Sequence, residues 1–121
     1  EEDPRTIDPR IPEHVAVASD HVSFDGVEPR LLKCLDRAAA IHRALFEAPL
    51  IVTSANDGAH VAGSAHYKGN ALDLRTRDKT AEQQLVWLVA LSYVAAQFHC
   101  AVFDERQRPA AGHFHLQYFG A

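Results

Sequence analysis

The chain has no excess of positive charge, with 12 Lys and Arg against 16 Asp and Glu and a formal net charge of −4. A nucleic-acid-binding surface needs a basic face, so this balance argues against a nucleic-acid partner. A hydrophobic amino-terminal segment is also lacking, so the sequence predicts no signal peptide in this stretch. The apolar run at 85–96 is too short to span a bilayer and contains Ser92 and Tyr93, so we expect a buried helix and no membrane span.

Cysteine is scarce, with only Cys34 and Cys100, which lie far apart in the sequence. They lack the close pairing of a zinc ribbon and are not expected to be metal ligands. A disulfide and two buried thiols both remain open. No internal repeat or low-complexity tract is present, and 121 residues with 47% apolar content suffice for one domain with a core.

The first half of the chain predicts an arm, a helix and a strand. Three prolines and many charges in 1–12 indicate an extended arm over 1–13, followed by a single domain over 14–121. Apolar and polar residues alternate weakly in 14–24, which allows a short strand there. A helix is expected over 28–46, with Pro29 in its first turn. Its apolar stripe comprises Leu31, Leu35, Ala38, His42 and Leu45. We expect His42 at the helix surface or boundary, not as a ligand.

The second half predicts strands around one further helix. Residues 50–53 and 71–74 are expected as strands, joined by a long polar loop of the kind that binds ligands. Thr80 and Gln83 fit a capping box for a helix over 81–98. Because this helix is apolar nearly all round, it is expected to be central, with Trp87 in the core. Strands at 100–105 and 113–119 form a final hairpin. The fold class is therefore α+β, a small, mainly antiparallel sheet with two main helices on one side.

One polar stretch, 64–75, carries the candidate chemistry. His66 and Asp73 stand seven residues apart, and Gly69 between them permits a turn with positive φ. His113 and His115 share a face if they lie on a strand. Imidazole and carboxylate groups are common zinc ligands, and two histidines with one aspartate leave an open position of the catalytic type. The alternative is that a chain with eight histidines shows such pairs by chance.

The pattern Ser64-x-His66-x-x-Gly69-x-Ala71-x-Asp73-x-Arg75 resembles the SxHxxGxAxDxR signature of the zinc D-alanyl-D-alanine carboxypeptidase family. That family includes L-alanyl-D-glutamate endopeptidases of phage endolysins, and its fold is shared by the amino-terminal domain of Hedgehog proteins. The segment 115–118 resembles the family's closing segment, which carries its third ligand. The resemblance covers roughly 31–119.

The resemblance implies a Hedgehog/DD-peptidase-like fold and one zinc ion per chain, held by His66, Asp73 and His115. It also implies hydrolysis of an amide bond in peptidoglycan stem peptides, by a metallopeptidase that degrades cell wall as an endopeptidase or a carboxypeptidase. Such a protein would act at the cell wall, whether secreted, periplasmic or borne by a phage.

The sequence departs from the family at the general base. Many members place a carboxylate three residues before the last ligand, where this chain has Gly112. The available carboxylates are Asp104 and Glu105. If Glu105 pairs with His113 across the hairpin, it shares a face with the histidines, whereas a one-residue slip favours Asp104. Both carboxylates could equally form a solvated hairpin end.

A second departure concerns substrate recognition. Many carboxypeptidase members carry a Tyr-Arg pair just after the first strand, and its arginine binds the substrate carboxylate. Here 55–57 reads Ala-Asn-Asp, which favours an endopeptidase.

Several further polar residues have more than one possible role. His113 could replace His115 as ligand, donate to the tetrahedral intermediate or orient a ligand. Tyr67 is a second candidate oxyanion donor. Ser64 and Arg75 could serve the site through hydrogen bonds. Alternatively, Ser64 is a turn residue and Arg75 pairs with Asp104 or Asp78.

Two classes of function follow. One is the zinc peptidase. The other is a zinc-stabilised binding or assembly module of the same fold without turnover, which the glycine at position 112 would allow. A weaker third possibility is a metal-free domain. A carboxylate near the open coordination position distinguishes the first two.

Overall fold

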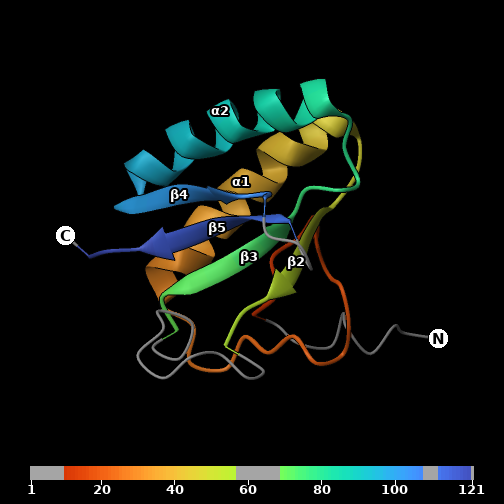
Figure 1. Cartoon of the computed structure of the whole chain (residues 1–121). Helices are drawn as coiled ribbons and strands as arrows, with labels where there is room; N and C mark the ends of the chain where they lie inside the picture. Colours follow the sequence, from red (N-terminus) through yellow and green to blue (C-terminus); the bar gives the residue numbers. More distant parts are fainter. Residues whose placement is uncertain (1–9, 57–68, 108–111, 121) are drawn as a thin grey trace.

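A computed structural model describes residues 10–56, 69–107 and 112–120, and Figure 1 shows it as two helices on one side of a sheet. The elements in chain order are β1 (Val15–Val17), α1 (Pro29–Phe46), β2 (Leu50–Ser54), β3 (Ala71–Arg75), α2 (Ala81–Gln97), β4 (Cys100–Glu105) and β5 (His113–Tyr118). The α+β class is confirmed. The described part of the chain contains no helix with the length and apolar character needed to cross a membrane.

The five strands lie in the order β1-β2-β3-β5-β4. In the carboxy-terminal hairpin, β5 therefore pairs with β3, and β4 forms the edge of the sheet. The β1–β2 pair is parallel and the other three pairs are antiparallel. Alternate residues of β3 and β5 fill the space between sheet and helices, and the fully buried ones are Leu72, Leu74, Phe114 and Leu116. The residues between them face away from the helices, which places the polar side chains of both strands on the open face.

Helix α1 begins at Pro29, as the position of that proline predicts, and ends before Glu47, which adopts a left-handed conformation. The expectation for His42 was wrong: its side chain is only 1% exposed. The ring of His42 packs edge-on against Phe46 and Trp87, and Nδ1 lies 2.8 Å from the Ala48 carbonyl oxygen. The hydrogen bond at Nδ1 and the aromatic contacts, of which Trp87 lies on the other helix, hold the imidazole in the interior, while Nε2 has no hydrogen-bond partner among the described residues.

Helix α2 begins at the predicted capping box, in which Thr80 and Gln83 each accept a hydrogen bond from the other's backbone N–H. The expectation of a central helix was wrong. Trp87 is fully buried as predicted, but α2 is an outer helix over α1 and β4 (Figure 1). Its neighbours among the described residues lie on one side, and the large apolar residues left exposed are Leu85, Val86, Val89 and Tyr93.

The turn before β3 depends on Gly69, which has the expected positive φ of 74°. A Cβ atom there would lie 2.0 Å from the Gly26 carbonyl oxygen, so any side chain is excluded. The Gly69 carbonyl also accepts a hydrogen bond from Glu28 N–H at 2.8 Å, which joins the turn to the start of α1. The strand that carries Asp73 is thereby fixed at its first residue.

The expected arm is described only from Arg10 onward. Arg10 forms an ion pair with Asp25, and Ile11 packs against the core. The two cysteines are buried free thiols, and Cys100 Sγ lies 3.6 Å from the Phe98 carbonyl oxygen.

Candidate metal centre

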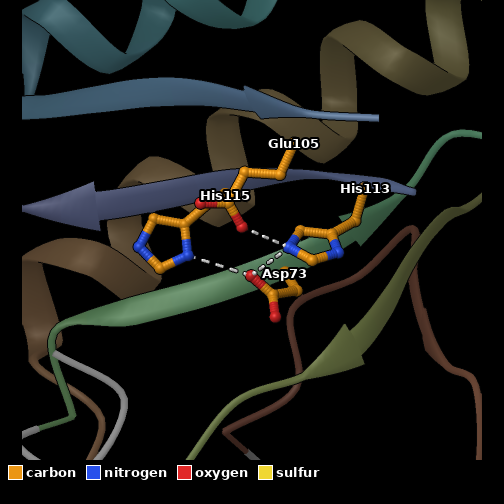
Figure 2. A group of neighbouring side chains, drawn as sticks. All are labelled: Asp73, Glu105, His113 and His115. Atoms are coloured by element: carbon orange, nitrogen blue, oxygen red, sulfur yellow. Dashed lines mark hydrogen bonds and ion pairs between the residues drawn. The ribbon is translucent and has the colours of Figure 1, made fainter. Parts of the chain in front are cut away.

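The candidate site lies on the open face of β3, β4 and β5 (Figure 2). The strand register sets two rows across these strands. In one row Asp73 pairs with His115, which pairs with Phe103. In the next row Arg75 pairs with His113, which pairs with Glu105. The predicted pairing of Glu105 with His113 is confirmed, and period-two alternation places these residues on one face.

Four of these residues converge. Asp73 Oδ1 lies 3.0 Å from His115 Nδ1 and 3.3 Å from His113 Nε2. Glu105 Oε1 lies 2.7 Å from the same nitrogen of His113. One ligand atom from each of Asp73, Glu105, His113 and His115 lies within 4.8 Å of all the others. The group can therefore hold a metal ion.

The site is sheltered but accessible. The side chains of Asp73, His113 and His115 are 12%, 13% and 14% exposed, and Glu105 is the most open at 25%. Partial burial strengthens electrostatic interactions inside the group because solvent screens them less. The greater exposure of Glu105 leaves its carboxylate reachable from solvent.

The other ring nitrogen of His115 shows which kind of species the site requires. Nε2 lies 2.9 Å from the Gln117 side-chain oxygen, and with the amide in this orientation Nε2 is the nitrogen that carries a hydrogen and donates it. In the neutral ring Nδ1 then has a lone pair that faces the Asp73 carboxylate at 3.0 Å. Two acceptors at that distance repel unless a positive species lies between them. A metal ion or a second proton on His115 meets this need.

The pKa of His115 reflects the same arrangement. Burial acts to lower the pKa, but hydrogen bonds to Asp73 and Gln117, together with the negative charges of Asp73 and Glu105, outweigh burial and raise it. The surroundings of His115 thus favour positive charge, which either a proton or a metal ion can supply.

Asp104, the alternative carboxylate, lies outside this group. It pairs with Phe114 in the register, whose side chain is on the helix side of the sheet. Its oxygens accept hydrogen bonds from Arg106 Nε at 2.8 Å and Arg106 Nη2 at 2.6 Å, and these bonds lower the pKa of Asp104. Asp104 is therefore held in an ion pair, and Glu105 is the carboxylate beside the histidines.

Arg75 is placed on the site's face beside His113 by the register. The alternative of an ion pair with Asp104 or Asp78 is not the arrangement seen, because Asp104 pairs with Arg106 and Asp78 with Lys79. Within the described residues, Arg75 Nε is buried without a hydrogen-bond partner.

Three of the sequence candidates, namely Ser64, His66 and Tyr67, lie outside the described residues. Gly112 accepts a hydrogen bond from Thr76 Oγ1 at 3.1 Å through its carbonyl, and no side chain stands there to act as a base.

Sequence reasoning gave no role to Gln117 and Phe103, both of which contact His115. The alternation that joined His113 to His115 extends by the same two-residue step to Gln117 and could have identified it. Phe103 could be found only after the hairpin register was known.

Comparison with known proteins gives no family model that matches this chain and no significant match to a curated protein.

Proposed function

We propose that this chain is a zinc-dependent peptidase that hydrolyses an amide bond in peptidoglycan stem peptides. The observation that carries the proposal is the approach of His115 Nδ1 to Asp73 Oδ1 at 3.0 Å, with the opposite nitrogen of His115 occupied by Gln117. His66 joins them as the third ligand on the strength of its motif. The substrate class rests on the same motif and not on the geometry.

The donors fit zinc, which binds histidine nitrogen and carboxylate oxygen, usually with three protein ligands at catalytic sites. A zinc ion bound there would polarise the substrate carbonyl and lower the pKa of a water molecule toward neutrality. The hydrogen bond of Gln117 to His115 orients the ring, and such outer contacts also raise the basicity of the ligand.

Glu105 is the proposed general base. Its carboxylate takes a proton from the attacking water and delivers it to the leaving amine. The 2.7 Å hydrogen bond to His113 fixes the carboxylate toward the centre. His113 is the proposed donor of a hydrogen bond to the oxygen on which negative charge develops. Both residues come from paired positions of one hairpin, so their relative placement is rigid.

The proposal favours an endopeptidase over a carboxypeptidase. Ala55 is fully buried, and the Asn56 amide donates to the Asp25 backbone carbonyl, so neither supplies a cation for a terminal carboxylate. A substrate bound without such a cation is held along its chain rather than by its end.

A closed metal site is the second candidate, and the four-residue group favours it. If Glu105 and His113 bind the metal together with Asp73 and His115, no position is left open. Closed four-ligand sites are typical of structural zinc. The chain would then be a zinc-stabilised binding or assembly module, in keeping with the absence of a side chain at Gly112.

The experiment follows both metal content and hydrolysis. Zinc-loaded protein is incubated with purified peptidoglycan, and newly released amino groups are quantified. Glu105→Gln should retain zinc and lose about 10²- to 10⁴-fold in rate, the usual contribution of a general base. Asp104→Asn is the matched control and should change the rate little, because that carboxylate is engaged by Arg106.

Each contrary result has a distinct meaning. If Glu105→Gln loses zinc, Glu105 is a ligand and the closed site is correct. If the parent protein with zinc releases no amino groups from peptidoglycan or stem-peptide mimics, the peptidase proposal is wrong. If both variants match the parent, neither carboxylate is the base.

A further inference from the structure

Two exposed phenylalanine rings border the candidate metal centre. Phe103 is 43% exposed and Phe119 is 60% exposed, whereas Phe24 and Phe114 are buried in the core. Phe103 is the β4 partner of His115 in the register and therefore shares the face of the centre. Exposed large apolar residues are common on protein surfaces, and what sets these two rings apart is their contact with each other and with His115 of the centre.

The rings extend outward from the centre in a continuous series. The Phe103 and His115 ring centroids are 5.8 Å apart with an interplanar angle of 60°. The Phe103 and Phe119 centroids are 6.1 Å apart with an angle of 57°. The first contact is edge-to-face and the second is tilted, so Phe103 is held between two rings while part of its surface stays open to solvent.

The Phe103 ring lies beside His115, within reach of a ligand that is bound at the centre. Consecutive Cα atoms are about 3.8 Å apart, so a side chain next to a carbonyl group at the centre can reach the Phe103 ring. Asp73 lies on the far side of His115 from this ring, and Glu105 is the next residue along β4 that faces the same side of the sheet. An apolar group on Phe103 would therefore lie on the side of His115 that is away from Asp73.

We infer that Phe103 and Phe119 form a subsite for an apolar, preferably aromatic, side chain next to the metal-binding group of a peptide-like ligand. The inference rests on the proposed metal centre and adds to it a preference for one class of neighbouring residue. It does not depend on turnover, because the subsite acts through binding.

Two hydroxamate probes test the subsite without any hydrolysis. Acetohydroxamate carries only the metal-chelating group, and 3-phenylpropionohydroxamate adds a phenyl arm. Affinities for the zinc-loaded protein are measured by calorimetry. The phenyl probe should bind about tenfold more tightly, as expected for partial burial of one ring. Phe103→Ala, and more completely the double variant with Phe119→Ala, should remove this preference, which is measured in each variant as the ratio of the two probe affinities.

Controls separate the subsite from general effects of truncation. Tyr93→Ala removes an exposed aromatic ring from α2, on the helix side of the sheet, and should leave the preference intact. Phe103→Leu should retain part of the preference because an apolar surface remains. Zinc content is measured for every variant, so that a lost ligand preference is not confused with a lost metal.

The outcomes distinguish a failure of the subsite from a failure of the proposed metal centre. Equal binding of the two probes to the parent protein, or a preference that survives in the double variant, overturns the subsite and leaves the metal centre in place. Failure of both probes to bind zinc-treated protein overturns the metal centre and the subsite together.

Discussion

Gln117 determines which nitrogen of His115 faces the centre, and a single substitution can test this. Gln117→Leu removes the hydrogen-bond acceptor 2.9 Å from Nε2, so the ring is no longer held with Nδ1 toward Asp73. Loss of such an outer contact typically lowers metal affinity about 10- to 100-fold. A competition titration with a zinc chelator measures the change. Gln97→Leu, on exposed surface of α2, is the control, and equal affinities for the two variants would contradict this role.

His42 predicts a dependence of stability on pH. Burial lowers its pKa from 6.5; the hydrogen bond to Ala48 opposes burial, and the nearby charge of Lys79 adds to it. The unfolded chain then binds a proton at His42 more readily than the folded chain does. The contribution of His42 to the free energy of unfolding is therefore complete above about pH 6.5 and declines as the pH falls below that value.

Substitution isolates this contribution. At pH 8, His42→Gln should be less stable than the parent by about 1–3 kcal/mol, from the lost hydrogen bond and packing. At pH 5 the difference should shrink, because only the parent has to exclude a proton from His42. Urea unfolding at both pH values measures it. A difference that stays constant would show that His42 does not titrate between them.

The sequence could predict individual site residues only where the two-residue periodicity of a strand places them on the same face. Glu105 was preferred over Asp104 on the two-residue alternation of a strand, and the structure places Glu105 beside His113. The burial of His42 was missed because its ring partner Trp87 lies on another helix, which no local pattern reveals.

At the scale of elements, both helices and the principal strands follow from local signals such as Pro29 and the capping box at Thr80. Strand partners do not. The parallel pairing of β1 with β2 depends on contacts between residues that are distant in sequence. The position of α2 was also missed, because an apolar circumference indicates a central helix only when neighbours cover every side. Here its outer face is exposed.

The contact between α1 and β4 predicts the reactivity of the two thiols. A hydrogen bond with Cys100, then burial, raises the pKa of Cys34, while the same hydrogen bond lowers the pKa of Cys100. Cys34 therefore keeps its proton at neutral pH. Both side chains are buried.

We expect the folded, reduced protein to resist alkylation by iodoacetamide at pH 8, because the reagent needs an accessible thiolate. Both cysteines should react once the chain is unfolded in urea. Mass spectrometry counts the modified residues in each state. Rapid double alkylation of the folded protein would mean that α1 and β4 separate readily.

At the scale of the whole molecule, the sheet divides the structure into a core on one face and the candidate centre on the other. Helices α1 and α2 pack against the apolar face through residues such as Leu72 and Phe114. The centre draws on β3, β4 and β5, so a metal ion would join three strands without touching either helix.

Chelation should therefore lower the melting temperature without removing the helices. A ligand that binds only the folded state, at a free concentration about 100 times its dissociation constant, stabilises by about 2.7 kcal/mol. For a chain of this size that corresponds to about 10 °C. Circular dichroism at 222 nm, recorded with zinc and with excess chelator, measures both the midpoint and the helical signal below it.

Asp73→Ala with His115→Ala should melt at the same temperature in both conditions, since two ligands are gone. A parent midpoint that does not respond to chelator would contradict the metal centre, and a loss of helical signal before melting would contradict the independence of the two faces.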